Sequence, residues 1–227
     1  MKNSQSLYLF PSSIFDSEQN DWLYPSYLTQ LKNCDFIFCE TAKVTRRFLK
    51  SIKSGFNLDQ VIELKNNLTN WEIEFVEKIK KGQSLGLMSD CGCPGIADPG
   101  QNLVQLAHQH HVKVVPLIGP SSIFLTLMAS GLNGQQFQFY GYLPKEDISL
   151  KKNLLTMGND RTHIFIETPY RNQKLLAIIL QTLSNQRWLC LGIDVGSAQE
   201  QIITKQVSQW KQNIPLINKK QVVFLIQ

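Results

Sequence analysis

Short runs of apolar residues alternate with longer amphipathic stretches through the first half of the chain. The runs hold four to six residues and are rich in Leu, Ile, Val and Phe, which is typical of buried strands. They are Leu7–Phe10, Asp35–Cys39, Val61–Leu64, Ser84–Met88 and Val112–Leu117. The stretches between them have helical spacing and are Asp21–Lys32, Lys43–Ser54, Asn70–Lys81 and Gln101–His111. This alternation predicts a parallel sheet with helices on both faces.

The second half of the chain has a different rhythm, because its later apolar runs lie closer together with turns between them. The predicted strands are Phe137–Tyr140, Thr162–Glu167, Trp188–Ile193, Gln201–Val207 and Val222–Ile226, and helices are expected near 121–131, 150–157 and 170–184. Such spacing favours a mixed sheet. We therefore predict an α/β protein of two domains. Residues 1–116 form a domain with a parallel sheet, residues 117–227 form one with a mixed sheet, and the two join near 116–120.

The composition is that of a compact globular protein. Of the 227 residues, 43% are apolar and 18% are charged, which excludes a disordered, collagen-like or coiled-coil chain. The first fifteen residues make a poor signal peptide, and the charge-free stretch Val114–Pro144 is broken by Pro and Gly before it reaches the length of a membrane span. We expect a soluble cytoplasmic protein. Its five cysteines should then be free thiols, and the histidines at 108, 110 and 111 are not expected to bind a metal.

Positive charge is unevenly distributed along the chain. Residues 1–114 carry 12 basic and 12 acidic side chains, whereas residues 115–227 carry 11 and 6 and so supply the net charge of +5. Within the first half, one predicted helix has a basic face opposite an apolar one; the basic residues are Lys43, Arg46, Arg47, Lys50 and Lys53. This face is either solvated or a strip that contacts the phosphates of a nucleic acid.

Two loops that follow predicted strands are candidates for ligand binding, because ligands of parallel sheets bind beyond the carboxyl ends of the strands. The loop Ser89–Gly100 holds three glycines and two prolines between Gly92 and Gly100, so it is a shaped loop rather than a loose one. Asp98 and Pro99 have the pattern of a cap for the next helix, whereas Asp90 has no such structural role and is a candidate for chemistry. The second loop, Pro116–Ser122, suits a carboxylate or a ribose, although its serines could also cap the helix.

Several nucleotide-binding and hydrolase motifs are missing from the chain. It contains no G-x-G-x-x-G, no G-x-x-x-x-G-K-[ST] and no G-x-S-x-G, which argues against a nicotinamide Rossmann domain, a P-loop enzyme and an α/β-hydrolase. From Pro99 to Pro144, Lys113 is the only charged residue. A site so poor in charge favours an amphipathic ligand held by backbone and apolar groups.

These loops also resemble a known family. The segment SDCGCPGIADPG, residues 89–100, resembles the SDAGTPGISDPG segment of the tetrapyrrole methylase superfamily, the class III S-adenosylmethionine methyltransferases. Further segments match in the same order: Gly119–Ser122, Met128–Leu132, Phe139–Lys145 and Ile164–Arg171, with a looser match at Cys39–Arg47. Within the superfamily, the chain is most similar to the branch of bacterial small-subunit rRNA ribose 2′-O-methyltransferases.

The resemblance implies a tetrapyrrole methylase-like fold, with S-adenosylmethionine in a cleft between two α/β domains, usually in a homodimer. Carried over position by position, it implies cofactor contacts at Pro11, Asp90, Cys91, Gly92, Cys93, Ile96, Ser121, Ser122 and Thr168. Since loss of a proton from a ribose hydroxyl needs a nearby base, Asp90 is the candidate catalytic residue, with Glu40 and Glu167 behind it. No metal is implied.

The chain departs from the family pattern at three places. The opening P-T-P-I-G-N-L is replaced by residues 10–16 without a glycine, E-D-T-R is replaced by residues 40–43, and R-E-L-T-K is replaced by residues 193–197. The sequence therefore leaves three hypotheses open. The protein is an S-adenosylmethionine-dependent methyltransferase of RNA, a methyltransferase of a small tetrapyrrole-like molecule, or a catalytically idle module that binds the cofactor.

Overall fold

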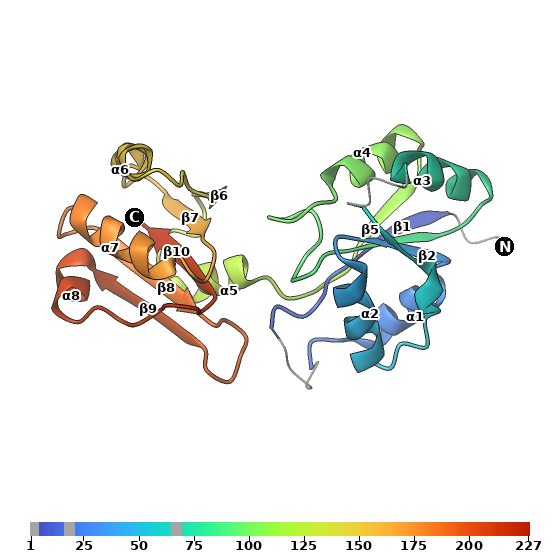
Figure 1. Ribbon diagram of the computed structural model, residues 1–227, viewed down its shortest axis with the longest axis horizontal. Coiled ribbons are helices and arrows are strands. Elements are labelled where there is room, and N and C mark those ends of the chain that lie inside the picture. Colours follow the sequence, from blue (N-terminus) through green and yellow to red (C-terminus); the bar gives the residue numbers. More distant parts are fainter. Residues whose placement is uncertain (1–4, 16–20, 65–69) are drawn as a thin grey trace. The chain divides into compact units, whose positions relative to one another are not determined.

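The computed structural model describes residues 5–15, 21–64 and 70–227. The chain divides into two compact units, residues 1–121 and 122–227, each with its own sheet (Figure 1). The α/β fold class predicted from the sequence is confirmed, with a parallel sheet first and a mixed sheet second.

The first unit is a parallel sheet of five strands in the order β3-β2-β4-β1-β5. The strands are β1 (Ser6–Phe10), β2 (Phe36–Cys39), β3 (Val61–Glu63), β4 (Leu85–Met88) and β5 (Lys113–Pro116). The helices are α1 (Pro25–Lys32), α2 (Ala42–Ser51), α3 (Trp71–Lys80) and α4 (Gln101–Gln109), with a short 3-10 turn at Leu58–Gln60.

Alternation along these strands builds a separate core on each face of the sheet. Tyr8, Ile37 and Met88 pack with α1 and α2 on one face, whereas Leu7 and Leu87 pack with α3 and α4 on the other. Figure 1 shows the two helix pairs on opposite sides of the sheet. Because both faces are covered, the strands are apolar along nearly their whole length, which is why short continuous apolar runs revealed them.

Gly86 in the middle of β4 makes room for an aromatic side chain. A Cβ atom at this position would lie 2.9 Å from the ring of Phe10 and 3.2 Å from the sulfur of Cys34. Phe10 is fully buried and packs edge-on against Tyr27, 5.3 Å between ring centroids. The ring therefore has no free space to move into, and the strand needs glycine here.

The second unit is a mixed sheet in the order β6-β7-β10-β8-β9, in which only the β6–β7 pair is parallel. Its strands are β6 (Phe137–Tyr142), β7 (Thr162–Ile166), β8 (Trp188–Ile193), β9 (Gln201–Gln206) and β10 (Val222–Ile226). Its helices are α5 (Ser122–Ser130), α6 (Asp147–Thr156), α7 (Asn172–Thr182) and α8 (Val207–Gln212). Helix α5 packs on one face of the sheet, and α6, α7 and α8 share the core on the other.

Several element boundaries differ from the sequence predictions, for local reasons. Helix α1 begins at Pro25 instead of Asp21, since proline favours the first turn of a helix and disfavours helical backbone before it. Helix α2 ends at Ser51, and Lys53 adopts a left-handed backbone beyond it. The predicted cap at Asp98-Pro99 is wrong: helix α4 starts at Gln101, and its capping residue is Gly100, with a φ of 137°. Helix α8 was not predicted.

The described residues include no helix that is long and apolar enough to cross a membrane. All five cysteines are free, as the sequence predicted. Cys34, Cys39 and Cys190 are buried, and their burial raises the pKa of each thiol, for Cys39 and Cys190 to about 11. These thiols are protonated at neutral pH and serve as small core residues.

Replacing Gly86 with Val should lower the free energy of unfolding by about 1–3 kcal/mol, because the new side chain meets the immobile Phe10 ring. Urea denaturation followed by circular dichroism measures the change. Gly134→Ala is the matched control, since nothing lies within 4 Å of a Cβ there. Equal stability of the two variants would show that the Phe10 ring can move aside.

Candidate functional site

The order of the strands brings three loops together at one end of the first sheet. Strands β4, β1 and β5 are neighbours, so the segments that follow them, residues 89–100, 11–15 and 117–121, share one edge. We call these segments the carboxyl-end loops. The chain leaves β1 toward β2 on one side and leaves β4 toward β5 on the other, so these two strands form the switch point of the sheet. Ligands of open α/β sheets bind at such a point.

Hydrogen bonds hold the loop after β1 to the loop after β4. The Ser12 backbone N–H donates to the carbonyl of Gly92 at 2.9 Å, and the Ser12 hydroxyl donates to the carbonyl of Ser89 at 3.0 Å. The Ser89 hydroxyl turns back to the Gly92 carbonyl at 3.2 Å. Tyr27 of α1 donates to the carbonyl of Pro11 at 2.7 Å. The loops are therefore rigidly placed before any ligand binds.

Close packing joins the third loop to the other two. A Cβ at Gly119 would lie 2.1 Å from the Cβ of Pro11, so only glycine lets the two backbones approach this closely. At Gly92, where φ is +74°, a Cβ would lie 3.3 Å from both Ile14 and the carbonyl of Pro120. The two glycines thus explain why these segments carry a recognisable sequence pattern.

Cys91 and Cys93 are not nucleophiles in this arrangement. The Cys91 sulfur lies 3.5 Å from the carbonyl of Ile14, and the Cys93 sulfur lies 3.4 Å from the carbonyl of Pro120. Burial of the sulfur, followed by the charges of Asp98 and Asp90, raises the pKa of Cys91 to about 11, and burial also raises the pKa of Cys93. Both thiols stay protonated at neutral pH and help to hold the loops.

Asp90 has a structural partner that the sequence did not reveal. Its Oδ1 accepts the backbone N–H of Thr41 at 3.0 Å, and Oε2 of Glu63 accepts the N–H of Ala42 at 2.9 Å. Two carboxylates, one at the end of β3 and one in the loop after β4, therefore satisfy N–H groups at the start of α2, whose capping residue Thr41 makes no side-chain capping hydrogen bond. Asp90 ties the loop after β4 to the loop after β2.

Ser122 and Thr168, two of the expected cofactor contacts, lie in the second unit, whereas the other seven lie in the first. Thr168 follows β7 within the motif that ends at Arg171. There, Glu167 is buried, accepts the N–H of Thr168 at 2.7 Å and pairs with Arg171 at 3.4 Å. Arg171 also donates to the carbonyl of Lys145 at 3.3 Å. The acid and the arginine of this motif therefore fasten a turn.

The basic face predicted on the helix after β2 is present. Lys43, Arg46, Arg47 and Lys50 are exposed on α2, while Phe48 and Leu49 are buried beneath them. The Arg46 Nε–H donates to the carbonyl of Leu58 at 3.1 Å, which fixes this side chain along the surface. An exposed cationic strip of this kind suits contact with phosphates.

The sequence does not mark the hydrogen-bonding groups that hold the carboxyl-end loops, chiefly Ser12, Ser89 and Tyr27. A serine or tyrosine carries no local signal of a partner far away in the chain, so only the folded structure identifies them. Among residues 5–15, 21–64 and 70–227, no three His, Cys, Asp or Glu side chains are grouped so that they could hold a metal ion.

Curated proteins with similar sequences share one description. The "Ribosomal RNA small subunit methyltransferase I" of Pasteurella multocida is 35% identical over 67% of this chain and 56% of its own length. The protein of the same description from Buchnera aphidicola subsp. Schizaphis graminum is 30% identical over 86% of this chain and 67% of its own length. The chain matches roughly half the length of several of these relatives. No family model matches it.

A solved structure shows the same fold. The cobalamin biosynthetic enzyme cobalt precorrin-4 methyltransferase aligns with a TM-score of 0.64 over 100% of this chain and 96% of its own. At 14% sequence identity, the likeness concerns the fold. It confirms the predicted tetrapyrrole methylase-like architecture.

Replacing Arg171 with Ala should lower the free energy of unfolding by about 2–3 kcal/mol, because it leaves the Glu167 carboxylate buried without its counterion. Thermal denaturation measures the loss. Arg161→Ala removes an arginine from an exposed ion pair with Asp160 and should leave the melting midpoint nearly unchanged. Similar midpoints for both variants would contradict the structural role of Arg171.

Proposed function

We propose that this chain transfers a methyl group from S-adenosylmethionine to a ribose hydroxyl of ribosomal RNA, because it belongs to the ribosomal RNA small subunit methyltransferase I branch of the tetrapyrrole methylase superfamily. The observation that carries the proposal is the interlocked set of carboxyl-end loops. Of the residues that hold these loops at the switch point of the sheet, Ser89, Gly92 and Gly119 lie in segments that match the superfamily's motifs, whereas Ser12 and Tyr27 do not.

The groups that the carboxyl-end loops offer fit S-adenosylmethionine. The loop after β4 turns through left-handed backbone at Gly92, Gly95 and Ala97, and open space lies beside Gly95, where a Cβ would meet nothing within 4 Å. Backbone there can approach a ligand closely. Asp90 and Asp98 are the charged residues of this loop, so its donors and acceptors are mostly backbone groups and hydroxyls, which suit an amphipathic molecule more than a polyphosphate.

We assign the cofactor contacts to the residues named from the resemblance, namely Pro11, Asp90, Cys91, Gly92, Cys93, Ile96 and Ser121 in the first unit, and Ser122 and Thr168 in the second. When bound, S-adenosylmethionine supplies an electrophilic methyl group on a sulfonium. The rigid loops hold such a ligand without prior rearrangement, which is the main requirement of an in-line transfer. Homodimer formation, which the resemblance implies, stays a prediction.

Asp90 is our candidate for the group that takes the proton from the acceptor hydroxyl. One of its oxygens, Oδ1, accepts the Thr41 N–H, which fixes the direction of the carboxylate. The other oxygen, Oδ2, is the one we assign to the proton. A base that is held in place in this way needs no reorganisation at the moment of transfer.

The RNA part of the proposal is supported by the basic face of α2 and by the excess of positive charge after residue 114. The low charge of residues 99–144 is what favours the second candidate, a small tetrapyrrole-like acceptor. Transfer of labelled methyl to ribosomal RNA, compared with transfer to a metabolite extract, separates the two. Cofactor binding without transfer to either acceptor would indicate an idle binding module.

Asp90→Asn should reduce the rate of methyl transfer at least 100-fold. The amide keeps an oxygen that can accept the Thr41 N–H, but it cannot take a proton. General-base assistance typically accelerates a reaction about 10²–10⁴-fold. Single-turnover transfer at saturating cofactor measures the loss, and thermal denaturation checks that stability is retained. Glu63→Gln is the matched control, since it makes the same exchange at the neighbouring N–H of the same helix. Full activity of Asp90→Asn would leave Asp90 with its structural role alone.

Replacing Lys43 and Lys50 together with Ala should weaken RNA binding at low salt and reduce the slope of log K against log salt by about 1.4, two contacts at about 0.7 each for single strands. These two are chosen because Arg46 also bonds to the backbone. Anisotropy of a labelled RNA across a salt series gives the slope. The control is the double variant Lys80→Ala and Lys81→Ala, whose lysines are both exposed near the end of α3. It removes the same amount of positive charge and should leave the salt slope unchanged. Equal slopes for both pairs would show that α2 is only a solvated face.

A further inference from the structure

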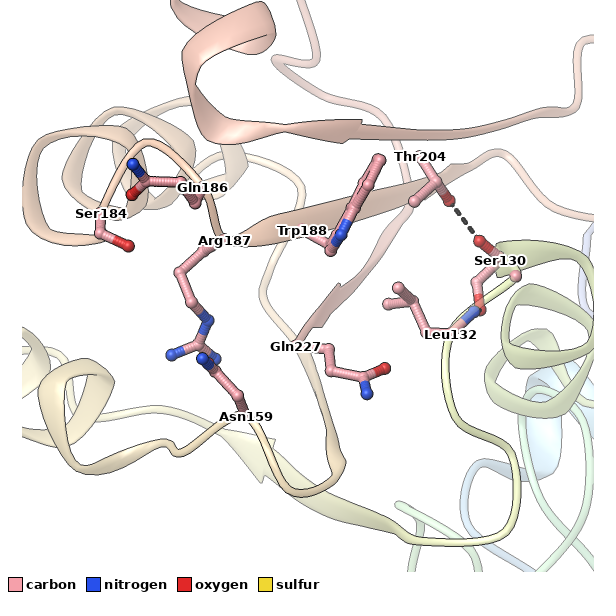
Figure 2. A pocket seen from close by; sticks show the side chains of 10 residues that line it. Ser130, Leu132, Asn159, Ser184, Gln186, Arg187, Trp188, Thr204 and Gln227 are labelled. Atoms are coloured by element: carbon pink, nitrogen blue, oxygen red, sulfur yellow. Dashed lines mark hydrogen bonds between the residues drawn. The ribbon is translucent and has the colours of Figure 1, made fainter.

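A concave site lies within the second unit, and none of the residues assigned to the cofactor lines it. It has a volume of about 710 Å³, within the range of sites for small organic ligands. It is formed where β8 begins, β10 ends and the segment after α5 turns back (Figure 2). None of its lining residues is acidic.

Trp188 supplies an exposed aromatic surface in this pocket. It is the first residue of β8, and 44% of its surface is exposed, whereas the neighbouring strand residues Leu189 and Cys190 are fully buried. Its backbone N–H donates to the carbonyl of Gln227 at 2.9 Å, and its carbonyl accepts the N–H of Gln227 at 3.1 Å. Figure 2 shows the indole near Thr204 and Leu132, on the opposite side of the pocket from Arg187. A fixed, exposed indole is a platform for stacking a planar ring.

Arg187 supplies positive charge that is already oriented. Its Nη1 donates to the carbonyl of Met157 at 2.7 Å, and its Nη2 donates to the carbonyl of Gly158 at 3.1 Å. Its Nε is buried and has no hydrogen-bond partner within the described part of the chain. No acidic side chain lines the pocket to neutralise the guanidinium, so an anionic group of a ligand can do so.

Amide side chains complete the lining. Asn159 and Gln186 are exposed, and Gln227 lies below Trp188 in Figure 2. The side-chain oxygen of Gln227 accepts the N–H of Asn133 at 2.9 Å, so its amide nitrogen is the end that can donate to a ligand. Amides offer both donors and acceptors, which is what the polar edge of a nucleobase requires.

We propose that this pocket binds one unstacked nucleotide of single-stranded RNA, with the base on the Trp188 indole and the phosphate near Arg187. An exposed indole, an oriented guanidinium and amide side chains are the groups that recognise splayed bases in RNA. The proposal rests on the proposed function, because it takes RNA as the acceptor. It adds a site in the second unit that selects which part of the RNA is held.

The test is the affinity of the full-length chain for a short single-stranded oligoribonucleotide, measured by fluorescence anisotropy. Trp188→Ala should weaken binding about 5- to 150-fold, the range expected for the loss of one stacked base, while Trp188→Phe should retain most of the affinity. Affinity for S-adenosylmethionine should be the same in all three proteins. An oligonucleotide that carries 4-thiouridine should crosslink to the peptide that contains Gln186 and Trp188.

Gln186→Glu provides a second variant that leaves the core untouched, because its side chain is exposed. The new negative charge should weaken oligonucleotide binding, whereas Gln212→Glu, an exposed position at the end of α8, should not. If both Trp188→Ala and Gln186→Glu bind the oligonucleotide with unchanged affinity, the assignment of the pocket to RNA is overturned, whereas the proposed function is not. If the unaltered chain binds no oligonucleotide, the assignment of the pocket to RNA is overturned as well.

Two further outcomes separate this inference from the proposed function and from a free nucleotide as ligand. Oligonucleotide binding that depends on Trp188, in a chain that methylates no RNA, would support the pocket and overturn the proposed function. A 5′-mononucleotide that binds through Trp188 as tightly as the oligonucleotide does would overturn the assignment to RNA, since neighbouring nucleotides would then add nothing.

Discussion

The close approach of Gly119 to Pro11 is the contact on which the candidate site depends. With 2.1 Å between the position of a Cβ at Gly119 and the Cβ of Pro11, the segments after β1 and β5 can meet only if one of them has no side chain. The loop after β4 then closes on both, through Ser12 and Gly92 on one side and Pro120 on the other. The result is a set of loops whose shape is decided by packing.

The two units contain different kinds of sheet, and each kind forms a different candidate site. In the first, five parallel strands direct all their carboxyl ends to one edge, which concentrates loops where ligands of such sheets bind. In the second, antiparallel pairing alternates the direction of the strands, so the ends of β10 and the start of β8 lie together and create the pocket around Trp188. We propose that the first arrangement supplies most of the cofactor contacts, and that the second supplies a site for one nucleotide of the RNA in addition to the basic face of α2.

Three carboxylates of this chain have structural partners, so an acidic side chain near a loop need not be a chemical group. Glu63 and Asp90 accept backbone N–H groups at the start of α2, and Glu167 fastens a turn with Arg171. Each gives a partner to a partly buried backbone N–H group, which is a structural reason for a carboxylate at that position. Asp90 alone also lies in the loop at the switch point, and for that reason it remains the candidate base.

The sequence by itself determined most of the elements and the place of the main loops. Apolar runs located the ten strands of the described residues to within one or two residues, because burial of both sheet faces makes β1 to β4 apolar and because the later strands are apolar at most positions. The glycines and prolines of residues 89–100 and 119–120 marked the shaped loops, and the spacing of charges revealed the basic face of α2.

Only the tertiary structure determined which strands are neighbours and which residues distant in sequence contact one another. It showed that β1 lies between β4 and β5, that Asp90 bonds to Thr41, 49 residues away, and that Gly100 rather than Asp98 caps α4. It also formed the pocket at Trp188 from segments between Ser130 and Gln227. Local patterns report whether a residue is buried or helical, since those depend on near neighbours in sequence. A hydrogen bond or a cavity between distant segments depends on how the whole chain packs, and no local pattern records it.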